Sequence, residues 1–398
     1  MKILLGSESF PPNISGVATA TQNLAENLTK NGHEAFVFTP GAVYESKYDR
    51  RFPDYKVLRL KSIINPFRAG YRVTFASKKK IREEVIKIAP DLIHIQDPAY
   101  IGTALRDIGR ELDIPVIVTN HFSLEYALSY VKFMRPVMPM LRQGLISYLV
   151  NFYNKCDQVV TPTETFRKEL ESWGVKTPVQ AVSNGIEIEQ FLKKVSEKEL
   201  KQTKDKFHLP NNPIVLYLGR VDKDKDIACL ANAIPLVLKK LNAHFVIAGT
   251  GGALPEVQKI VNDAGISNAV TFLGFIEHNS PDFVNLYKNS ALFAIPSPIE
   301  TQSIVTLEAL STGLPVVGAN SGALPELIHN NKNGFLFKTG DHKQLSASII
   351  DILSDKKKAK RMGRTSIGIA LHHEMDKAFN VMLDLYEEVI DRKKTKND

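Results

Sequence analysis

The stretch LFAIPSPIETQSIVTLEALSTGLPVV, residues 292–317, carries the strongest structural signal in the chain. It begins with the apolar run Leu292–Ile295, continues through a loop with Ser and Pro, and enters a helical pattern that ends near Gly313. A second apolar run follows at Val316 and Val317. A strand, a helix and another strand in this order are typical of a parallel sheet.

Similar short apolar runs recur along the whole chain. They lie at residues 3–5, 35–38, 92–95, 116–118 and 158–160, and again at 214–218, 244–248 and 270–272. Helical patterns separate them, such as the one from Val17 to Leu28, where Gly32 occupies the position of a C-cap. This alternation predicts an α/β fold with two Rossmann-like, doubly wound parallel-sheet domains.

A polar segment with the features of a linker separates the two series of strands. Residues 193–206 are rich in Lys and Glu, and the turn-forming sequence Pro210–Pro213 follows them. We therefore expect an N-terminal domain at residues 1–190, a C-terminal domain at 191–367, and a C-terminal helix over 368–398 that packs back on the first domain. Ligands of such sheets bind outside the carboxyl ends of the strands, so we expect the domains to face each other across a cleft.

Composition and charge narrow the class of protein. The 398 residues are 43% hydrophobic and 24% charged, as expected of a folded protein with two cores. The net charge of +8 fits a phosphate-bearing ligand or an anionic membrane surface, and without a motif that mixes aromatic and basic residues we expect no nucleic-acid partner. Two scattered cysteines and no apolar run of about 18 residues predict a cytoplasmic protein that spans no membrane, with peripheral binding to the inner face of the cell membrane still open.

The loop after the first apolar run is a candidate phosphate site. It ends in Ser15-Gly16 at the start of a helical pattern, where backbone N–H groups and a glycine allow a phosphate to approach closely. An ordinary strand-to-helix turn is the alternative.

Two basic residues follow the strand at 214–218. Arg220 offers a planar fork and Lys225 a point charge, which together suit the neutralisation of a departing diphosphate. The alternative is that Arg220 and Lys225 are ordinary surface residues among aspartates and bind no ligand.

Two carboxylates flank the start of the helix in the opening stretch. Glu300 lies in the loop, and Glu308 lies about two turns into the helix, on the face of its first residue. Glu300 can accept hydrogen bonds from sugar hydroxyls and Glu308 from a ribose, while the N–H groups near Val305 and Thr306 face a phosphate.

Other motifs accompany this pair. They are Gly219-Arg220 with Lys225, Ala248–Gly251, Phe272–Phe275, Gly313–Val317, Pro325-Glu326, Asn333–Leu336 and, in the first half, Phe10–Gly16, Pro90–Asp97, Val118–His121 and Asn184–Glu187. Together they resemble the family 4 retaining glycosyltransferases of the GT-B type, whose fingerprint is a Glu, seven residues and a second Glu. The resemblance covers nearly the whole second half of the chain.

The resemblance implies a role for each matching residue. Candidate catalytic residues are Glu300, His121, Arg220 and Lys225. Candidate donor-binding residues are Gly16, Arg220, Lys225, Gly249, Phe275, Gln302, Ser303, Ile304, Val305, Thr306 and Glu308. Candidate acceptor-side residues are His94, Asp97, His121, Glu125 and Tyr126. A buried core histidine is the alternative for His121, and Ser303 stands where the family carries Gly beside the donor sugar.

Within the family, the sequences at 300–302 and 119–126 most resemble bacterial 1,2-diacylglycerol 3-alpha-glucosyltransferases. The next segment, Tyr130–Leu145, mixes apolar side chains with basic ones, as contact with an anionic membrane requires. Pro136 and Pro139 exclude one continuous helix, and a segment buried between helices is the alternative. Its basic residues are Lys132, Arg135 and Arg142.

The expected activity is transfer of a hexose, glucose from UDP-glucose, to a membrane lipid such as diacylglycerol. The chemistry needs no cofactor and no metal, because Arg220, Lys225 and helix N-termini stabilise the diphosphate. Three alternatives remain: a hexosyl- or mannosyltransferase for another lipid or soluble sugar, a sugar-nucleotide epimerase on the same fold, and a non-catalytic carbohydrate- or nucleic-acid-binding protein.

Overall fold

The computed structural model describes residues 1–13, 15–41, 48–64, 72–129, 137–278 and 280–395, apart from the side chains of residues 126 and 129. The chain forms two compact units: unit 1 comprises Met1–Asn184 and Ala378–Asp398, and unit 2 comprises Gly185–Lys377. The chain thus leaves unit 1 after Asn184 rather than after residue 190, and it returns at Ala378 rather than at residue 368.

Unit 1 contains a sheet of eight strands among its described residues, in the order β4-β3-β2-β1-β5-β6-β7-β8. All neighbouring strands are parallel except β4, which runs antiparallel to β3 at one edge. The five predicted strands of this half are present, whereas β3, β4 and β8 were not predicted. The strands are β1 (Lys2–Gly6), β2 (Glu34–Gly41), β3 (Lys56–Ile64), β4 (Arg72–Thr74), β5 (Leu92–Ile95), β6 (Val116–Thr119), β7 (Gln158–Thr161) and β8 (Val179–Ala181).

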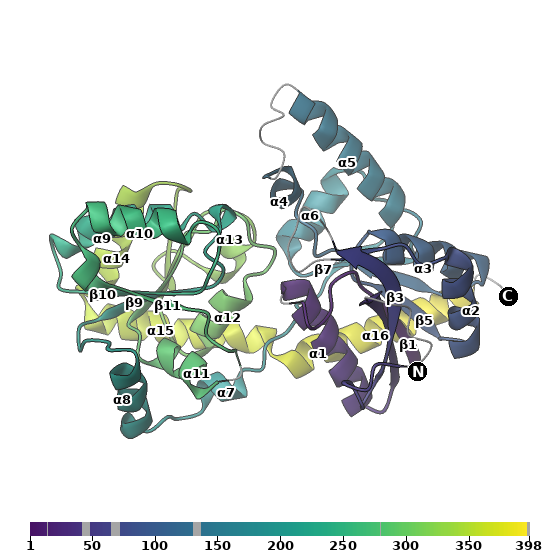
Figure 1. Ribbon diagram of the computed structural model, residues 1–398, viewed down its shortest axis with the longest axis horizontal. Coiled ribbons are helices and arrows are strands. Elements are labelled where there is room, and N and C mark those ends of the chain that lie inside the picture. The colour runs from purple at the N-terminus through teal and green to yellow at the C-terminus, as the bar shows by residue number, and fades with distance from the viewer. Residues whose placement is uncertain (14, 42–47, 65–71, 130–136, 279, 396–398) are drawn as a thin grey trace. The chain divides into compact units, whose positions relative to one another are not determined.

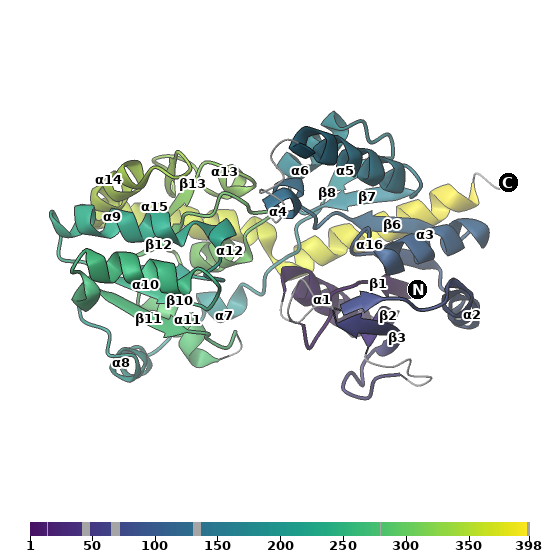
Figure 2. The same cartoon turned by 45° about the horizontal axis from the view of Figure 1, so that its top comes forward.

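Both faces of this sheet are covered by helices. Leu4 of β1 belongs to one buried cluster and its neighbours Ile3 and Leu5 to another, so successive side chains enter cores on opposite faces. Phe379 and Tyr386 of the last helix pack in the second core, which confirms that this helix packs on the first domain, and Figure 2 shows it lying along the sheet. The helices are α1 (Gly16–Lys30), α2 (Lys78–Ile88), α3 (Tyr100–Glu111), α4 (Leu124–Ser129), α5 (Met138–Tyr153), α6 (Glu164–Ser172) and α16 (Met375–Lys394).

Unit 2 contains a parallel sheet whose described strands follow the order β11-β10-β9-β12-β13-β14. Figure 1 shows helices on both of its sides. The strands are β9 (Ile214–Leu218), β10 (His244–Ala248), β11 (Val270–Gly274), β12 (Leu292–Ile295), β13 (Val316–Ala319) and β14 (Gly334–Phe337). The helices are α7 (Glu189–Leu192), α8 (Glu197–Lys206), α9 (Ile227–Leu238), α10 (Leu254–Asp263), α11 (Pro281–Lys288), α12 (Ile304–Ser311), α13 (Leu324–Leu327), α14 (His342–Leu353) and α15 (Lys356–Ala370).

The predicted linker at 193–206 is wrong over most of its length, because Glu197–Lys206 form α8. Ser196 caps this helix and Glu199 completes a capping box. Thr203 on its buried side donates a hydrogen bond of 3.0 Å to Asp282. The helix therefore belongs to unit 2, and its many charged residues face solvent.

Each sheet has one point at which the order of its strands changes direction. In unit 1 this point lies between β1 and β5, and in unit 2 it lies between β9 and β12. The loops that leave two such strands diverge to opposite faces, which opens a crevice at the carboxyl edge. These two edges are therefore where ligands are expected.

Candidate active site

A lysine and a glutamate meet at the switch point of unit 2. Lys225 ends a 3-10 helix at Lys223–Lys225 after β9, and Glu300 lies in the loop after β12. Lys225 Nζ lies 2.7 Å from Glu300 Oε1 and 3.3 Å from the carbonyl oxygen of Ile299. Both side chains are largely buried, so the pair offers a shielded positive and negative charge at the place where the fold binds ligands.

Arg220 begins the same loop after β9. Its guanidinium pairs with Asp222 and lies 2.8 Å from Asp224, while its backbone carbonyl accepts a 2.6 Å hydrogen bond from Tyr217. The two aspartates hold the planar fork in an exposed position from which it can also reach a phosphate.

The glycines of this edge allow its loops to pack closely. Gly249, directly after β10, has φ +143°, and a Cβ there would lie 1.8 Å from the carbonyl oxygen of Gly219. Only glycine fits such a contact. Phe275, which follows β11, is largely exposed at the same edge.

The amino terminus of α12 forms the next part of the site. Gln302 and Ser303 are buried, and Ser303 has a left-handed backbone with φ +67°. Its hydroxyl lies 2.7 Å from Thr306 Oγ1. The N–H groups of the following residues Ile304 and Val305 occupy the first turn, where a helix presents donors and a partial positive charge.

Glu308 is buried on α12 and is held from two sides. Its Oε2 accepts a 2.7 Å hydrogen bond from the hydroxyl of Tyr287, and its Oε1 lies 2.7 Å from His278 Nε2. Burial and the neighbouring carboxylate of Glu308 raise the pKa of Tyr287 well above its usual value, so the hydroxyl remains a donor. A carboxylate fixed in this way keeps further acceptor capacity for the hydroxyls of a ligand.

The switch point of unit 1 contains a second pair of carboxylates. The backbone N–H of Glu8, after β1, donates a 2.8 Å hydrogen bond to Asp97 Oδ2, after β5. Burial, together with the charge of Glu8, raises the pKa of Asp97 to about 7, and burial raises the pKa of Glu8 as well. Asp97 Oδ1 is buried without a hydrogen-bond partner, so this oxygen is available to a ligand hydroxyl.

His121 lies next to this pair, directly after Asn120 and the carboxyl end of β6. Its Nε2 lies 3.1 Å from Gln96 Oε1, and burial lowers its pKa to about 4, so the ring is neutral near pH 7. The side-chain nitrogens of Gln96 and Asn120 are buried without partners, like Asp97 Oδ1. Strands β5 and β6 thus bring unpaired polar atoms to one edge of the sheet.

Comparison with known proteins assigns these two edges to a family. Residues 14–190 match the family model described as Glycosyltransferase Family 4, and residues 199–367 match that of Glycosyl transferases group 1. Alpha-monoglucosyldiacylglycerol synthase from Streptococcus pneumoniae is 31% identical over 360 residues, which cover 89% of this chain and 78% of the relative. The chain belongs to the family 4 glycosyltransferases.

Other matches have the same fold with different substrates in their names. A GDP-mannose-dependent alpha-mannosyltransferase from Corynebacterium glutamicum is 24% identical over 363 residues, 90% of this chain and 82% of the relative. HepE from Anabaena, solved with UDP and glucose, is similar in structure with a TM-score of 0.77 at 19% identity, over 98% of this chain and 100% of that one. The glycosyltransferase is therefore a hexosyltransferase with the GT-B fold.

In this glycosyltransferase His94 is a core residue. Its ring is fully buried on β5, with Nδ1 2.6 Å from the Tyr386 hydroxyl and Nε2 2.7 Å from Thr119 Oγ1. Burial, with the nearby His121, lowers its pKa to about 3. Both ring nitrogens of His94 are thus bonded within unit 1, and its place on the acceptor side stays a prediction.

Gly16 is the first residue of α1, and Ser15 caps the helix by accepting from Ala18 N–H at 3.1 Å. A Cβ on Gly16 would meet nothing within 4 Å, so the fold of unit 1 itself does not require glycine there. Its role in binding a phosphate stays a prediction.

Glu125 and Tyr126 lie on α4, which follows His121. Glu125 is exposed and forms an ion pair with Arg142 of α5. Residues 130–136, with Lys132 and Arg135, lie outside the described residues. α4 ends at Ser129 and α5 begins at Met138, with Pro139 in its first turn. Figure 1 shows the amino-terminal half of α5 extending away from the sheet of unit 1. None of residues 137–148 is fully buried, which contradicts burial between helices for that part.

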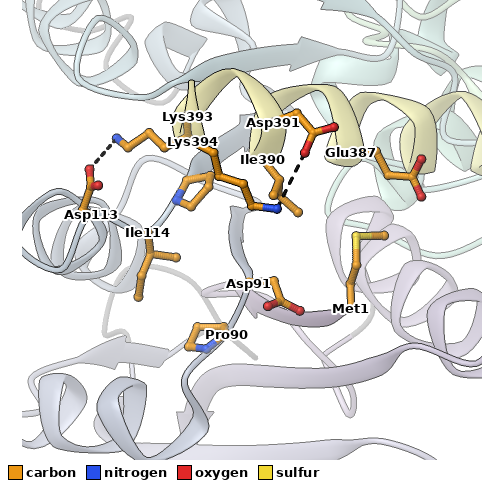
Figure 3. A pocket seen from close by; sticks show the side chains of 11 residues that line it. Met1, Pro90, Asp91, Asp113, Ile114, Glu387, Ile390, Asp391, Lys393 and Lys394 are labelled. Atoms are coloured by element: carbon orange, nitrogen blue, oxygen red, sulfur yellow. Dashed lines mark ion pairs between the residues drawn. The ribbon is translucent and has the colours of Figure 1, made fainter. Parts of the chain in front are cut away.

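A cavity of about 670 Å³ in unit 1 is not part of this site. Figure 3 shows Lys393 paired with Asp113 and Lys394 with Asp391 around it. Met1, Asp91 and Pro115, which line it, each precede a strand, so it opens at the amino ends of the strands. The ligand loops of the enzyme leave the opposite edge.

Several site residues were not predicted from the sequence. Glu8, His278 and Tyr287 belong to no expected motif, and Gln96 lies in the motif Pro90–Asp97 but was given no role of its own; the contacts that reveal all four join segments far apart in the chain. The position of Glu8, in the loop directly after the first strand, could have indicated that it lies at the ligand-binding edge of the sheet. Within the described residues no group of three or more His, Cys, Asp or Glu is arranged to hold a metal ion, and independence from metals stays a prediction.

Proposed function

We propose that this glycosyltransferase moves glucose from UDP-glucose to a membrane lipid such as diacylglycerol, with retention of the anomeric configuration and without a metal ion. The observation that carries the proposal is the charged pair of Lys225 and Glu300 at the switch point of unit 2. The name of the pneumococcal relative, a synthase of monoglucosyldiacylglycerol, supports the choice of sugar and acceptor.

Unit 2 is proposed to hold the donor. Glu308 accepts hydrogen bonds from the ribose hydroxyls, and the first N–H groups of α12 meet the diphosphate. Arg220 and Lys225 then offset the charge that develops on the leaving UDP, a task that a metal ion performs in other transferases.

The Lys225–Glu300 pair suggests how the donor is recognised. Without a donor, the lysine neutralises the glutamate at 2.7 Å. When the phosphates attract Lys225, Glu300 becomes free to accept hydrogen bonds from the glucose hydroxyls. The bond from glucose C1 to the β-phosphate oxygen breaks, the acceptor oxygen bonds C1 from the same side, and the acceptor proton passes to the departing phosphate.

Unit 1 is proposed to hold the acceptor. Asp97 Oδ1 and the unpaired nitrogens of Gln96 and Asn120 are suited to the hydroxyls of the acceptor. His121 is neutral and lies beside them, where it can share a hydrogen bond with the reacting sugar.

A membrane acceptor agrees with the exposed half of α5. Met140 is among the most exposed apolar side chains of the chain, and Arg142 lies one turn from its start. Among the described residues, no helix is long and apolar enough to cross a membrane. We propose that this half of α5 rests on an anionic membrane surface, where the apolar and basic side chains both contribute to binding.

The test is transfer of labelled sugar from UDP-glucose, UDP-galactose and GDP-mannose to diacylglycerol and to soluble sugars. The proposal expects UDP-glucose and diacylglycerol to be the preferred pair. Preference for GDP-mannose would contradict the proposed donor, and preference for a soluble sugar would contradict the proposed acceptor. Conversion of the nucleotide sugar without an acceptor would favour an epimerase.

A further inference from the structure

The β3–β4 hairpin of unit 1 has its polar and apolar faces exchanged. Ser62 pairs with Thr74, and Ile63 pairs with Val73 in the antiparallel register. Residues opposite each other share a face, so Ser62 and Thr74 lie on one side and Ile63 and Val73 on the other. The polar pair is buried, whereas Ile63 is 55% and Val73 45% exposed. An edge hairpin in water normally shows the reverse pattern.

A third apolar side chain extends this surface. The N–H of Phe75 donates a 3.0 Å hydrogen bond to the carbonyl of Lys61, which continues the register and places Phe75 on the face of Ile63 and Val73. Phe75 is 46% exposed. We call these three residues, Ile63, Val73 and Phe75, the hairpin surface.

Basic residues surround the hairpin surface. Lys61 Nζ lies 5.3 Å from the centre of the Phe75 ring, and Arg72 bonds Ser62 Oγ at 2.8 Å. Between Lys56 and Lys80 the sequence contains eight Lys or Arg residues and no Asp or Glu. Acidic residues from other segments pair with Lys56, Arg59 and Lys78, which leaves Lys61 and Arg72 as basic side chains beside the hairpin surface. An apolar surface with basic side chains beside it matches the interface of an anionic lipid bilayer, where apolar groups enter the acyl boundary and cations meet the headgroups.

The hairpin also contacts the acceptor edge of its own unit. β3 runs parallel to β2 and β1, so Ile63 and Ile64 lie at the carboxyl end of the sheet. On β4, Thr74 donates a 2.7 Å hydrogen bond to Glu8 Oε2, and the N–H of Glu8 in turn bonds Asp97. Through Thr74 and Glu8, the hairpin is thus linked to Asp97, the carboxylate proposed to meet the acceptor.

We propose that the hairpin surface docks on an anionic lipid bilayer and thereby brings the acceptor edge of unit 1 to the membrane. The inference rests on the proposed lipid acceptor and adds a docking element separate from α5. A lipid acceptor would then reach Glu8 and Asp97 from the bilayer without leaving it for water.

The experiment uses the full chain and sedimentation or flotation with vesicles of phosphatidylcholine and phosphatidylglycerol. The variant Ile63→Ser with Val73→Ser should partition onto these vesicles roughly tenfold less than the wild type. Lys61→Gln, or high salt, should weaken binding severalfold at the same lipid content. A matched control is Val381→Ser with Leu192→Ser, since each of these side chains is 42% exposed elsewhere; it should bind vesicles like the wild type.

Two further measurements keep the result interpretable. UDP affinity and the thermal unfolding midpoint show whether the hairpin variant is folded, and Phe75→Ser provides a single substitution if the double one unfolds. For folded variants, the ratio of transfer rates to diacylglycerol in vesicles and to monomeric dioctanoylglycerol should fall with vesicle binding.

Vesicle binding that is unchanged in the hairpin variants would overturn the proposal. So would a loss of self-association, measured by light scattering, without a loss of vesicle binding, because a second copy would then be the partner. If the wild type transfers no sugar to any lipid yet its vesicle binding depends on the hairpin, the proposed acceptor fails and the docking surface stands.

Discussion

Removing one hydroxyl, in Tyr287→Phe, tests whether Glu308 must be held in place to bind the donor. The hydroxyl lies 2.7 Å from Glu308 Oε2 inside unit 2, and both side chains are buried. A hydrogen bond to a charged group contributes about 1.5–3 kcal/mol, and a buried carboxylate that loses a donor is costly. For a unit of this size each kcal/mol corresponds to roughly 2–4 °C, so we expect the unfolding midpoint of unit 2 to fall by about 3–12 °C.

The same change should weaken the binding of UDP. With only the contact to His278 described above still in place, Glu308 can rotate away from the ribose, and we expect roughly tenfold weaker UDP binding by calorimetry. The maximal transfer rate should change less than the affinity, because the reacting groups are untouched.

The control is Tyr153→Phe, which removes an equally buried hydroxyl from Asn120 Oδ1 at 2.8 Å in unit 1. This bond joins neutral groups, so its loss should cost about 0.5–1.5 kcal/mol and leave UDP affinity unchanged. A Tyr287→Phe protein that is less stable but binds UDP like the wild type would refute the positioning role.

Three further predictions concern the charged and strained positions. Arg220→Ala and Lys225→Ala should each reduce kcat by about a hundredfold or more through lost leaving-group stabilisation, while EDTA should not change kcat; loss of activity on chelation would contradict the metal-free mechanism. The pKa of Asp97 is raised to about 7, so between about pH 4 and pH 7 the native state keeps a proton that the unfolded chain has lost. The free energy of unfolding should therefore decrease as the pH rises from about 4 to about 7, and denaturant titrations of Asp97→Asn should lack this decrease. Ser303→Gly should stay within about 1 kcal/mol in stability, since relief of φ +67° offsets the lost contact with Thr306, and competition assays should show a changed preference among UDP-sugars.

The fold could be predicted where local patterns and tertiary structure agree. Buried parallel strands such as Leu92–Ile95 are continuous apolar runs, and a glycine such as Gly32 marks the end of its helix. β3 was missed because the charged Arg59 interrupts its buried apolar run at residues 57–60. β4 was missed because, where it pairs with β3, the exposed face is apolar and the buried face polar, which hides the usual alternation. α8 was read as a linker because its charged residues mostly face water and its place in the fold depends on a few contacts, such as Thr203 with Asp282.

The candidate site could be predicted in part for a similar reason. Lys225 and Glu300 follow neighbouring strands, and the topology brings such residues together at one edge. His94 and His121 both stand near the ends of strands, and the sequence does not show that Tyr386, far along the chain, buries the first of them. The supports of Glu308 come from a loop and from α11, and their geometry depends on packing that no local pattern encodes.

The central claim is that the chain forms a glucosyl lipid through the charged pair of unit 2. Its most direct test is incubation with UDP-glucose and diacylglycerol vesicles, with the anomeric configuration of the product read by proton NMR, for the wild type and Glu300→Gln. We expect an α-glucosyl lipid from the wild type and loss of most of that product from a folded Glu300→Gln protein, because the substitution removes a negative charge beside the sugar. A β-linked product, or full activity in the folded variant, would contradict the account.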